Sequence, residues 1–290
     1  MAADVVSYTL GSLVRHARRM LEEASRPEPA LDARLLVEHF TATSRTDAIT
    51  DPDREVQAGQ VAAVLAALDR RLAGEPVHRI IGSRDFYGLK LKLSSETLEP
   101  RPDTETLVDL VLPLVKAAAD RHGACTILDM GTGTGAIALA LLSEEARSTA
   151  LASDISADAL ATASANADMT GNTGRVTTVQ SDWYQAIEGR FHIIVSNPPY
   201  IASREIDLLE REVRDHDPLA ALDGGPDGLD PYRAIAAGAR HHLQEDGHVA
   251  VEVGHDQADV VRAIFEKHGL VFVRSARDLG GHERALLFAV

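Results

Sequence analysis

The chain lacks most features of secreted and membrane proteins. Its 290 residues include one cysteine, Cys125, and aromatic residues make up only 4% of the sequence. A single cysteine excludes an internal disulfide, and its place beside an apolar run favours a buried structural thiol. No apolar run approaches the roughly 20 residues of a membrane span, and the first residues lack a signal peptide's basic and apolar segments. We therefore expect a cytoplasmic protein that makes no contact with a membrane.

Positive charge is also scarce. The chain has 29 Lys and Arg against 44 Asp and Glu, a net charge of −15. Nucleic-acid binding draws much of its affinity from basic side chains on phosphates, so we expect no stable nucleic-acid binding. A local basic patch is compatible with an acidic whole, which leaves a nucleic-acid substrate open. The histidines show no ligand spacing with cysteine or carboxylates, so no metal site is predicted.

Two domains are expected from length and pattern. Helical periodicity over residues 9–20, 30–40 and 53–73 predicts a small N-terminal helical domain. The alternation over residues 85–98 predicts a β-hairpin. The remainder alternates strand and helix, which predicts an α/β fold with a mostly parallel sheet. The expected domains are a helical domain over residues 1–74, a β-hairpin linker over 75–100 and a catalytic domain over 101–290.

A glycine turn stands between a buried strand at 126–130 and a helical pattern at 136–142. Strand, glycine turn and helix form a nucleotide cradle, since glycine lets a ligand approach the backbone N–H groups. Asp154 follows about 20 residues on, at the end of the next strand, where a ribose-binding carboxylate is expected. On these features alone a nicotinamide-dependent dehydrogenase is the alternative, because the spacing of Gly131, Gly133 and Ala136 also fits the dinucleotide fingerprint. The turn consists of Gly131, Thr132, Gly133, Thr134 and Gly135.

The apolar run 191–196 ends in four residues that predict an acceptor site. Two consecutive prolines remove two backbone donors, which leaves the Pro198 carbonyl as a free acceptor beside the Asn197 side-chain oxygen. Two acceptors can hold one NH₂ group, and Tyr200 offers a flat face for an amide or a base. The four residues are Asn197, Pro198, Pro199 and Tyr200.

The order of these elements favours one cofactor over the other. Asp182 and Trp183 follow a third strand at 176–180, and the Asn-Pro-Pro-Tyr turn follows the fourth. Together the four strand ends resemble those of class I S-adenosylmethionine-dependent methyltransferases that methylate amino groups. The resemblance implies that residues 131–135 pass under the methionine part, that Asp154 binds the ribose hydroxyls, and that Asp182 and Trp183 border the adenine.

Three further segments narrow the family. Residues 74–82, 99–105 and 213–225 are similar to segments of the release factor glutamine methyltransferases, the PrmC or HemK family. One departure is Glu99, where the family usually has an aliphatic residue. The resemblance implies N5-methylation of the glutamine in the Gly-Gly-Gln loop of class I peptide chain release factors, with the N-terminal domain helping to engage that protein. A nucleic-acid adenine N6-methyltransferase remains the alternative, because it uses the same tetrapeptide on a flipped base.

Three structural details are also expected. Asp103 is a candidate N-cap for a helix that begins at Thr104, with a role near the cofactor as the alternative. Residues 247–253 predict a fifth strand. Residues 284–290 predict a last, antiparallel strand at the edge of the sheet. We expect the chain to act as a monomer.

Overall fold

The computed structural model describes residues 7–290, which form two compact units, one up to residue 82 and the other over residues 83–290. The expected domain boundaries at residues 74 and 100 stay predictions. In the part of the chain that the structure describes, no helix combines the length and the apolar character needed to cross a membrane.

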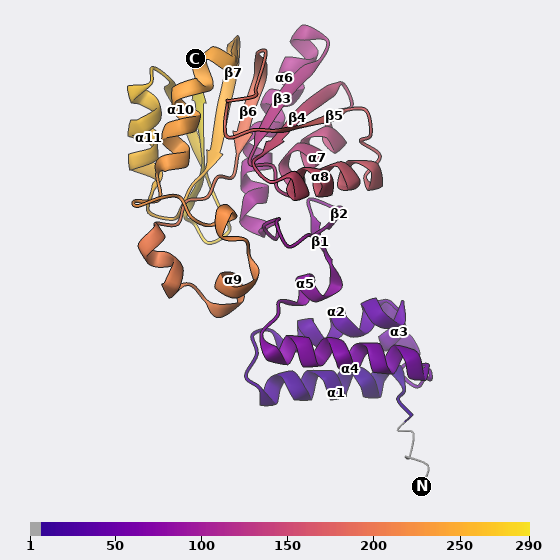
Figure 1. The fold of residues 1–290 in the computed structure, drawn as a ribbon. Helices are drawn as coiled ribbons and strands as arrows, with labels where there is room; N and C mark the ends of the chain where they lie inside the picture. The colour runs from indigo at the N-terminus through magenta and orange to yellow at the C-terminus, as the bar shows by residue number, and fades with distance from the viewer. Residues whose placement is uncertain (1–6) are drawn as a thin grey trace. The chain divides into compact units, whose positions relative to one another are not determined.

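The first unit is helical, as predicted. Leucine side chains of α1, α2 and α4, among them Leu13, Leu36 and Leu68, are fully buried against one another. A buried ion pair of 2.6 Å joins Arg71 on α4 to Asp32 on α2. These three helices lie side by side (Figure 1). The helices are α1 (Leu10–Glu23), α2 (Pro29–Thr41), α3 (Arg45–Thr50), α4 (Ala58–Ala73) and α5 (Val77–Ile81).

The second unit begins with the predicted hairpin, β1 (Ser83–Phe86) and β2 (Leu89–Lys92). Glu99, which departs from the family pattern, is buried and pairs with Arg84 of β1. The rest is an α/β sandwich. Its strands are β3 (Cys125–Met130), β4 (Ser148–Asp154), β5 (Val176–Gln180), β6 (Phe191–Ser196), β7 (Leu243–Glu252), β8 (Val271–Arg277) and β9 (Glu283–Ala289). Its helices are α6 (Glu105–His122), α7 (Ala136–Glu144), α8 (Ala157–Met169), α9 (Arg211–His216), α10 (Asp230–His242) and α11 (Ala258–Lys267).

The seven strands form one sheet in the order β5-β4-β3-β6-β7-β9-β8, which confirms the predicted mostly parallel sheet. The parallel strands are paired in register. Met130 of β3 lies opposite Ser153 of β4 and Ser196 of β6, and Ser196 lies opposite Val251 of β7. Because parallel strands point the same way, the residues that follow these four positions meet at one edge of the sheet.

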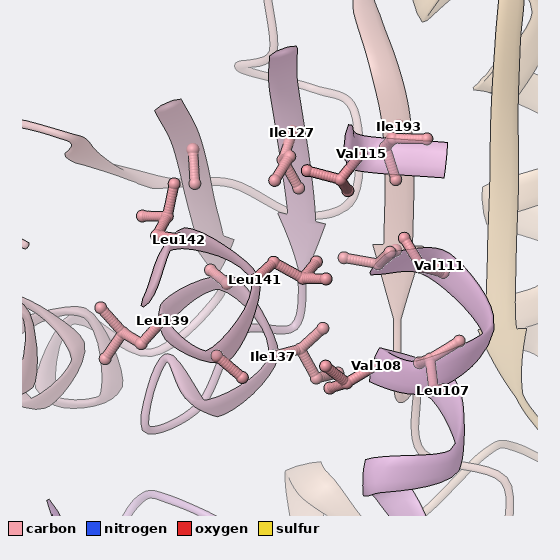
Figure 2. Packing of buried hydrophobic residues seen from close by; sticks show 14 of the residues in the cluster. Leu107, Val108, Val111, Val115, Ile127, Ile137, Leu139, Leu141, Leu142 and Ile193 are labelled. Atoms are coloured by element: carbon pink, nitrogen blue, oxygen red, sulfur yellow. The ribbon is translucent and has the colours of Figure 1, made fainter. Parts of the chain in front are cut away.

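Side chains alternate between the two faces of the sheet, and helices cover both. Ile127 and Ile193 point to the face covered by α6 and α7, where Val108, Val111 and Ile137 pack against them (Figure 2). The alternate residues Leu128 and Ile194 pack on the other face with α10 and α11. Figure 1 shows the two sets of helices on either side of the strands.

The last strand is not where the sequence placed it. β9 is antiparallel, as predicted, but it lies between β7 and β8, so the prediction that it forms the edge is wrong. The residues Ala285 to Phe288 are all buried, which suits a strand covered on both faces, whereas Val271 and Val273 of β8 are exposed. The continuous apolar run of β9 is the signal for a central position.

The packing in Figure 2 predicts the effect of a cavity mutation. Ile127 is fully buried, so Ile127→Ala should lower the free energy of unfolding by about 2–5 kcal/mol, because the small pocket between sheet and helices cannot fully collapse. Leu279 is fully exposed, and Leu279→Ala should change that free energy by less than about 0.5 kcal/mol. Urea unfolding measures both. Equal effects would contradict this description of the core.

Candidate active site

A cavity of about 670 Å³ opens at the carboxyl ends of the parallel strands. This is the edge where ligands bind in open α/β sheets. Most of the predicted site residues line the cavity. They are Gly131, Thr132, Gly133, Thr134, Asp154, Asp182, Trp183, Asn197 and Pro199. Three predicted residues, Gly135, Pro198 and Tyr200, are not among the residues that line it.

The glycines of this turn are needed for two different reasons. Gly131, Gly133 and Gly135 all have positive φ, at 66°, 54° and 82°, which disfavours other residues. A Cβ on Gly131 or Gly133 would meet no protein atom within 4 Å, so both face open space. A Cβ on Gly135 would lie 3.3 Å from the Cβ of Ala163 on α8. The first two glycines therefore leave room for a ligand, and the third allows close helix packing.

Asp129 holds this turn from behind. Its Oδ2 accepts a hydrogen bond from the Thr132 hydroxyl at 2.8 Å and one from the backbone N–H of Ala138 at 3.2 Å. The side chain is completely buried, and burial raises the pKa of Asp129 to about 6. Asp129 is not among the site residues predicted from the sequence. Its signal was a carboxylate inside an otherwise apolar strand.

Asp154 joins the second strand end to the glycine turn. Its Oδ2 accepts from the Gly133 N–H at 2.9 Å, and its Oδ1 accepts from the Ser156 N–H at 2.9 Å. The N-cap of α8 is Ser156, whose hydroxyl accepts from the Ala159 N–H. An ionised carboxylate has about four acceptor sites, so Asp154 keeps the capacity to accept two ligand hydroxyls.

Trp183 sits on the cavity wall in a strained conformation. Its φ is +48°, which is rare for a bulky residue and persists only where surrounding contacts enforce it. The Ser181 hydroxyl donates to the Trp183 carbonyl at 2.8 Å, and the indole packs against the core that includes Ile194. The neighbouring Asp182 is exposed and also lines the cavity.

The Asn-Pro-Pro-Tyr turn is held by a glycine-rich loop over residues 223–228. The Ile201 N–H donates to the Leu222 carbonyl at 3.0 Å, and the Ile201 carbonyl accepts from the Gly224 N–H at 2.8 Å. The Gln257 side chain donates to the Tyr200 carbonyl at 2.9 Å. Among the described residues, no donor is hydrogen-bonded to the Pro198 carbonyl. Burial raises the pKa of Tyr200 to about 12, so its phenol stays neutral at physiological pH.

The segment before α6 supports Asn197 and does not form the predicted cap. No side-chain cap is formed at α6, so the assignment of Asp103 as N-cap is wrong. Asp103 lies in a 3₁₀ turn, Pro102–Thr104, and its carboxylate is 3.6 Å from Arg284. Thr104 instead accepts a hydrogen bond from the Asn197 Nδ2 at 3.2 Å. Thr104 and Arg101 both line the cavity, so this segment belongs to the site.

A second buried carboxylate lies behind Asn197. Glu252 ends β7 and is 2% exposed. Burial raises its pKa to about 7, although Thr104, Arg284 and Asn197 act in the opposite direction. From the sequence, residues 247–253 were predicted only as a strand, with no role for Glu252 in the site. A glutamate in that apolar run was the available signal.

The fold and the position of this cavity are those of an α/β protein of the class I methyltransferase type. A solved structure with the same fold is the hMettl16 catalytic domain in complex with MAT2A 3′UTR hairpin 1, with a TM-score of 0.55. It is 13% identical, and the match covers 83% of this chain and 84% of that one. At this identity the likeness is one of fold alone.

Family models and relatives identify the family. The PrmC N-terminal domain matches residues 12–82, and the methyltransferase small domain matches residues 109–214. A release factor glutamine methyltransferase of Agrobacterium fabrum is 53% identical, covering 94% of both chains. One of Caulobacter vibrioides is 42% identical, covering 93% of both. This chain belongs to the release factor glutamine methyltransferase family.

The loop that holds the Asn-Pro-Pro-Tyr turn yields a prediction for Gly228. A Cβ there would lie 2.4 Å from the Tyr200 carbonyl oxygen, and φ is +74°. Gly174 has a similar φ of +81°, but its Cβ would meet no atom within 4 Å. Gly174→Ala therefore isolates the backbone strain of about 1 kcal/mol, and Gly228→Ala adds a clash with backbone.

In urea unfolding, Gly228→Ala should cost at least about 1 kcal/mol more than Gly174→Ala. Equal losses would mean that residues 223–228 do not pack on the turn as described.

Proposed function

We propose that this chain transfers the methyl group of S-adenosylmethionine to the side-chain amide nitrogen, N5, of the glutamine in the Gly-Gly-Gln loop of class I peptide chain release factors. The modification modulates translation termination. Family membership supports this substrate. The observation that best supports this chemistry is the position of Asn197. It lines the cavity, and it follows Ser196, which lies opposite Met130, the residue before the glycine turn.

The residues of the cavity fit S-adenosylmethionine. The open space over Gly131 and Gly133 accommodates the methionine part, and the free acceptor sites of Asp154 suit the ribose hydroxyls. Asp182 and the flat indole of Trp183 suit the adenine. When bound, the cofactor would supply an activated methyl group on a sulfonium. Transfer would break the S–CH₃ bond and leave S-adenosylhomocysteine, and the methylated nitrogen would lose one proton to solvent.

The chain's own residues act on the acceptor nitrogen. An amide nitrogen is a poor nucleophile, so it must be held in line with the methyl group, and the positive charge that develops on it must be stabilised. The Asn197 side-chain oxygen and the Pro198 carbonyl accept hydrogen bonds from the NH₂ group. These bonds strengthen as the nitrogen becomes acidic, so they stabilise the transition state more than the ground state. Tyr200 holds the plane of the amide.

We also propose that the N-terminal domain engages the release factor, with residues 1–74 as the docking domain and 75–100 as the linker. The chain acts as a monomer in the cytoplasm and binds no nucleic acid stably. The excess of acidic residues, 44 against 29 basic, supports a protein acceptor with a basic surface.

Transfer of labelled methyl tests the substrate. Purified chain and labelled S-adenosylmethionine should label the cognate release factor at the Gly-Gly-Gln glutamine, as mapped by mass. A release factor with that glutamine changed to alanine serves as the control and should stay unlabelled. DNA and RNA in parallel tubes test the adenine alternative. Label on nucleic acid alone would contradict the proposed substrate.

The Asn197→Ala variant tests the acceptor clamp. It removes one of the two acceptors that stabilise the developing charge, so kcat should fall by roughly 10²–10³, the loss typical of one such group. Calorimetry should show nearly unchanged affinity for S-adenosylmethionine, because the glycine turn and Asp154 remain. Wild-type turnover in this variant would rule out the mechanism.

A further inference from the structure

Glu252 is a buried carboxylate that the mechanism above does not use. Glu252 follows Val251 of β7, which lies opposite Ser196, the last residue of β6. Glu252 and Asn197 therefore stand at the same level of neighbouring strands. The Glu252 side chain is not part of the cavity lining, and its Oε2 is buried without a hydrogen-bond partner among the described residues. Leaving such an atom unpaired is costly, so Glu252 needs a reason to be there.

The contacts lead from Glu252 to Asn197. The polar groups of Thr104 and Asn197 lie close enough to lower the pKa of Glu252, and so favour its ionised form against the effect of burial. The Asn197 Nδ2 also donates to the Thr104 hydroxyl at 3.2 Å, and Thr104 is 4% exposed. Thr104 therefore engages the NH₂ end of the Asn197 amide, and the Glu252 carboxylate lies on the neighbouring strand behind it. With that end occupied, the Oδ1 end is left for the cavity, where the mechanism needs an acceptor.

We propose that Glu252 and Thr104 are positioning residues that fix the side-chain amide of Asn197 with its oxygen toward the acceptor nitrogen. The ionised Glu252 carboxylate also places negative charge behind Asn197. This charge stabilises the positive charge that develops on the acceptor nitrogen during methyl transfer. The inference rests on the proposed function, since it concerns the same site.

The ionisation of Glu252 decides which way the Asn197 amide faces. A carboxylate only accepts hydrogen bonds, so it selects the NH₂ end of the amide, whereas a protonated carboxyl can donate to the oxygen end. Arg284 of β9 and Asp103 before α6 face this group, as do the phenols of Tyr200 and Tyr232. Arg284 favours the charged form, and Asp103 disfavours it. Burial dominates and raises the pKa of Glu252 to about 7.

This positioning role predicts a pH dependence with a definite sign. The competent, ionised form of Glu252 accumulates as pH rises through about 7, so kcat of the wild type should rise between about pH 6 and pH 8. Glu252→Gln has the same shape but no charge, and its amide accepts and donates alike. Its kcat at pH 8 should be roughly 10- to 100-fold lower, the range expected for a hydrogen bond to a charged group, and the rise should disappear. The KM for the release factor and the affinity for S-adenosylmethionine should stay near wild type.

Thermal stability separates this role from a structural one. The raised pKa of Glu252 means that the folded state favours the neutral form, so the contribution of this residue to stability is lost as pH rises through about 7. At pH 8 the ionised carboxylate is a cost to the fold. Glu252→Gln should therefore keep or raise the melting temperature at pH 8, while a structural role predicts that it falls.

Two controls match this variant. Glu145 pairs with Arg147 at 2.9 Å beyond the end of α7 that is remote from the glycine turn, and Arg147 lowers the pKa of Glu145 to about 2. Glu145→Gln should lower the melting temperature at pH 8 and leave the pH profile of kcat unchanged. The second control is Thr104, whose hydroxyl accepts a hydrogen bond from Asn197. Thr104→Val should lower kcat, whereas Thr104→Ser keeps the hydroxyl and should retain most of the wild-type kcat.

The experiment measures kcat, KM, cofactor affinity and melting temperature of these variants from pH 6 to pH 8. Loss of the pH-dependent rise in Glu252→Gln with retained stability supports the proposal. A wild-type profile in Glu252→Gln would overturn it, and so would a fall in kcat that only parallels a fall in melting temperature. The acceptor is whichever molecule the wild type labels, so a failure of the proposed substrate is seen first and separately.

Discussion

The parallel register of β3, β4, β6 and β7 is the constraint on which the site depends. Met130, Ser153, Ser196 and Val251 lie in one row across the sheet, so the next residue of each strand reaches the same edge. Those next residues are Gly131, Asp154, Asn197 and Glu252. A shift of one residue in any pair would turn a functional side chain to the other face. Ser196 reinforces the row, because its hydroxyl donates to the Met130 carbonyl at 2.7 Å.

Two parts of the cavity wall, the glycine turn and Asn197, each have a buried carboxylate behind them. Asp129 holds the glycine turn through Thr132, and Glu252 stands behind Asn197 beside Thr104. In each case burial raises the pKa of the carboxyl, to about 6 and about 7. Burying a carboxylate lowers stability. The two buried carboxylates lie where the geometry of the site is most important, at the backbone of the glycine turn and at the side-chain amide of Asn197.

Much of the site could be read from the sequence because it depends on local chemistry. The glycine turn, Asp154 and the double proline each follow an apolar strand, and strand ends in an α/β sheet converge. The parts that were wrong or missed depend on contacts between distant segments. Asp103 had the right residue type for a cap, but Thr104 is engaged by Asn197 and Asp103 lies beside Arg284. The place of β9 between β7 and β8 likewise depends on burial by distant segments, because β9 is covered on both faces whereas Val271 and Val273 of β8 are exposed.

If Asn197 and Pro198 hold the acceptor amide by its nitrogen, a crystal structure of the chain with S-adenosylhomocysteine and a Gly-Gly-Gln peptide should show it. We expect the glutamine nitrogen within hydrogen-bond distance of both the Asn197 Oδ1 and the Pro198 carbonyl, and in line with the cofactor sulfur. A glutamine nitrogen held by other groups, with Asn197 turned away from it, would rule out this clamp.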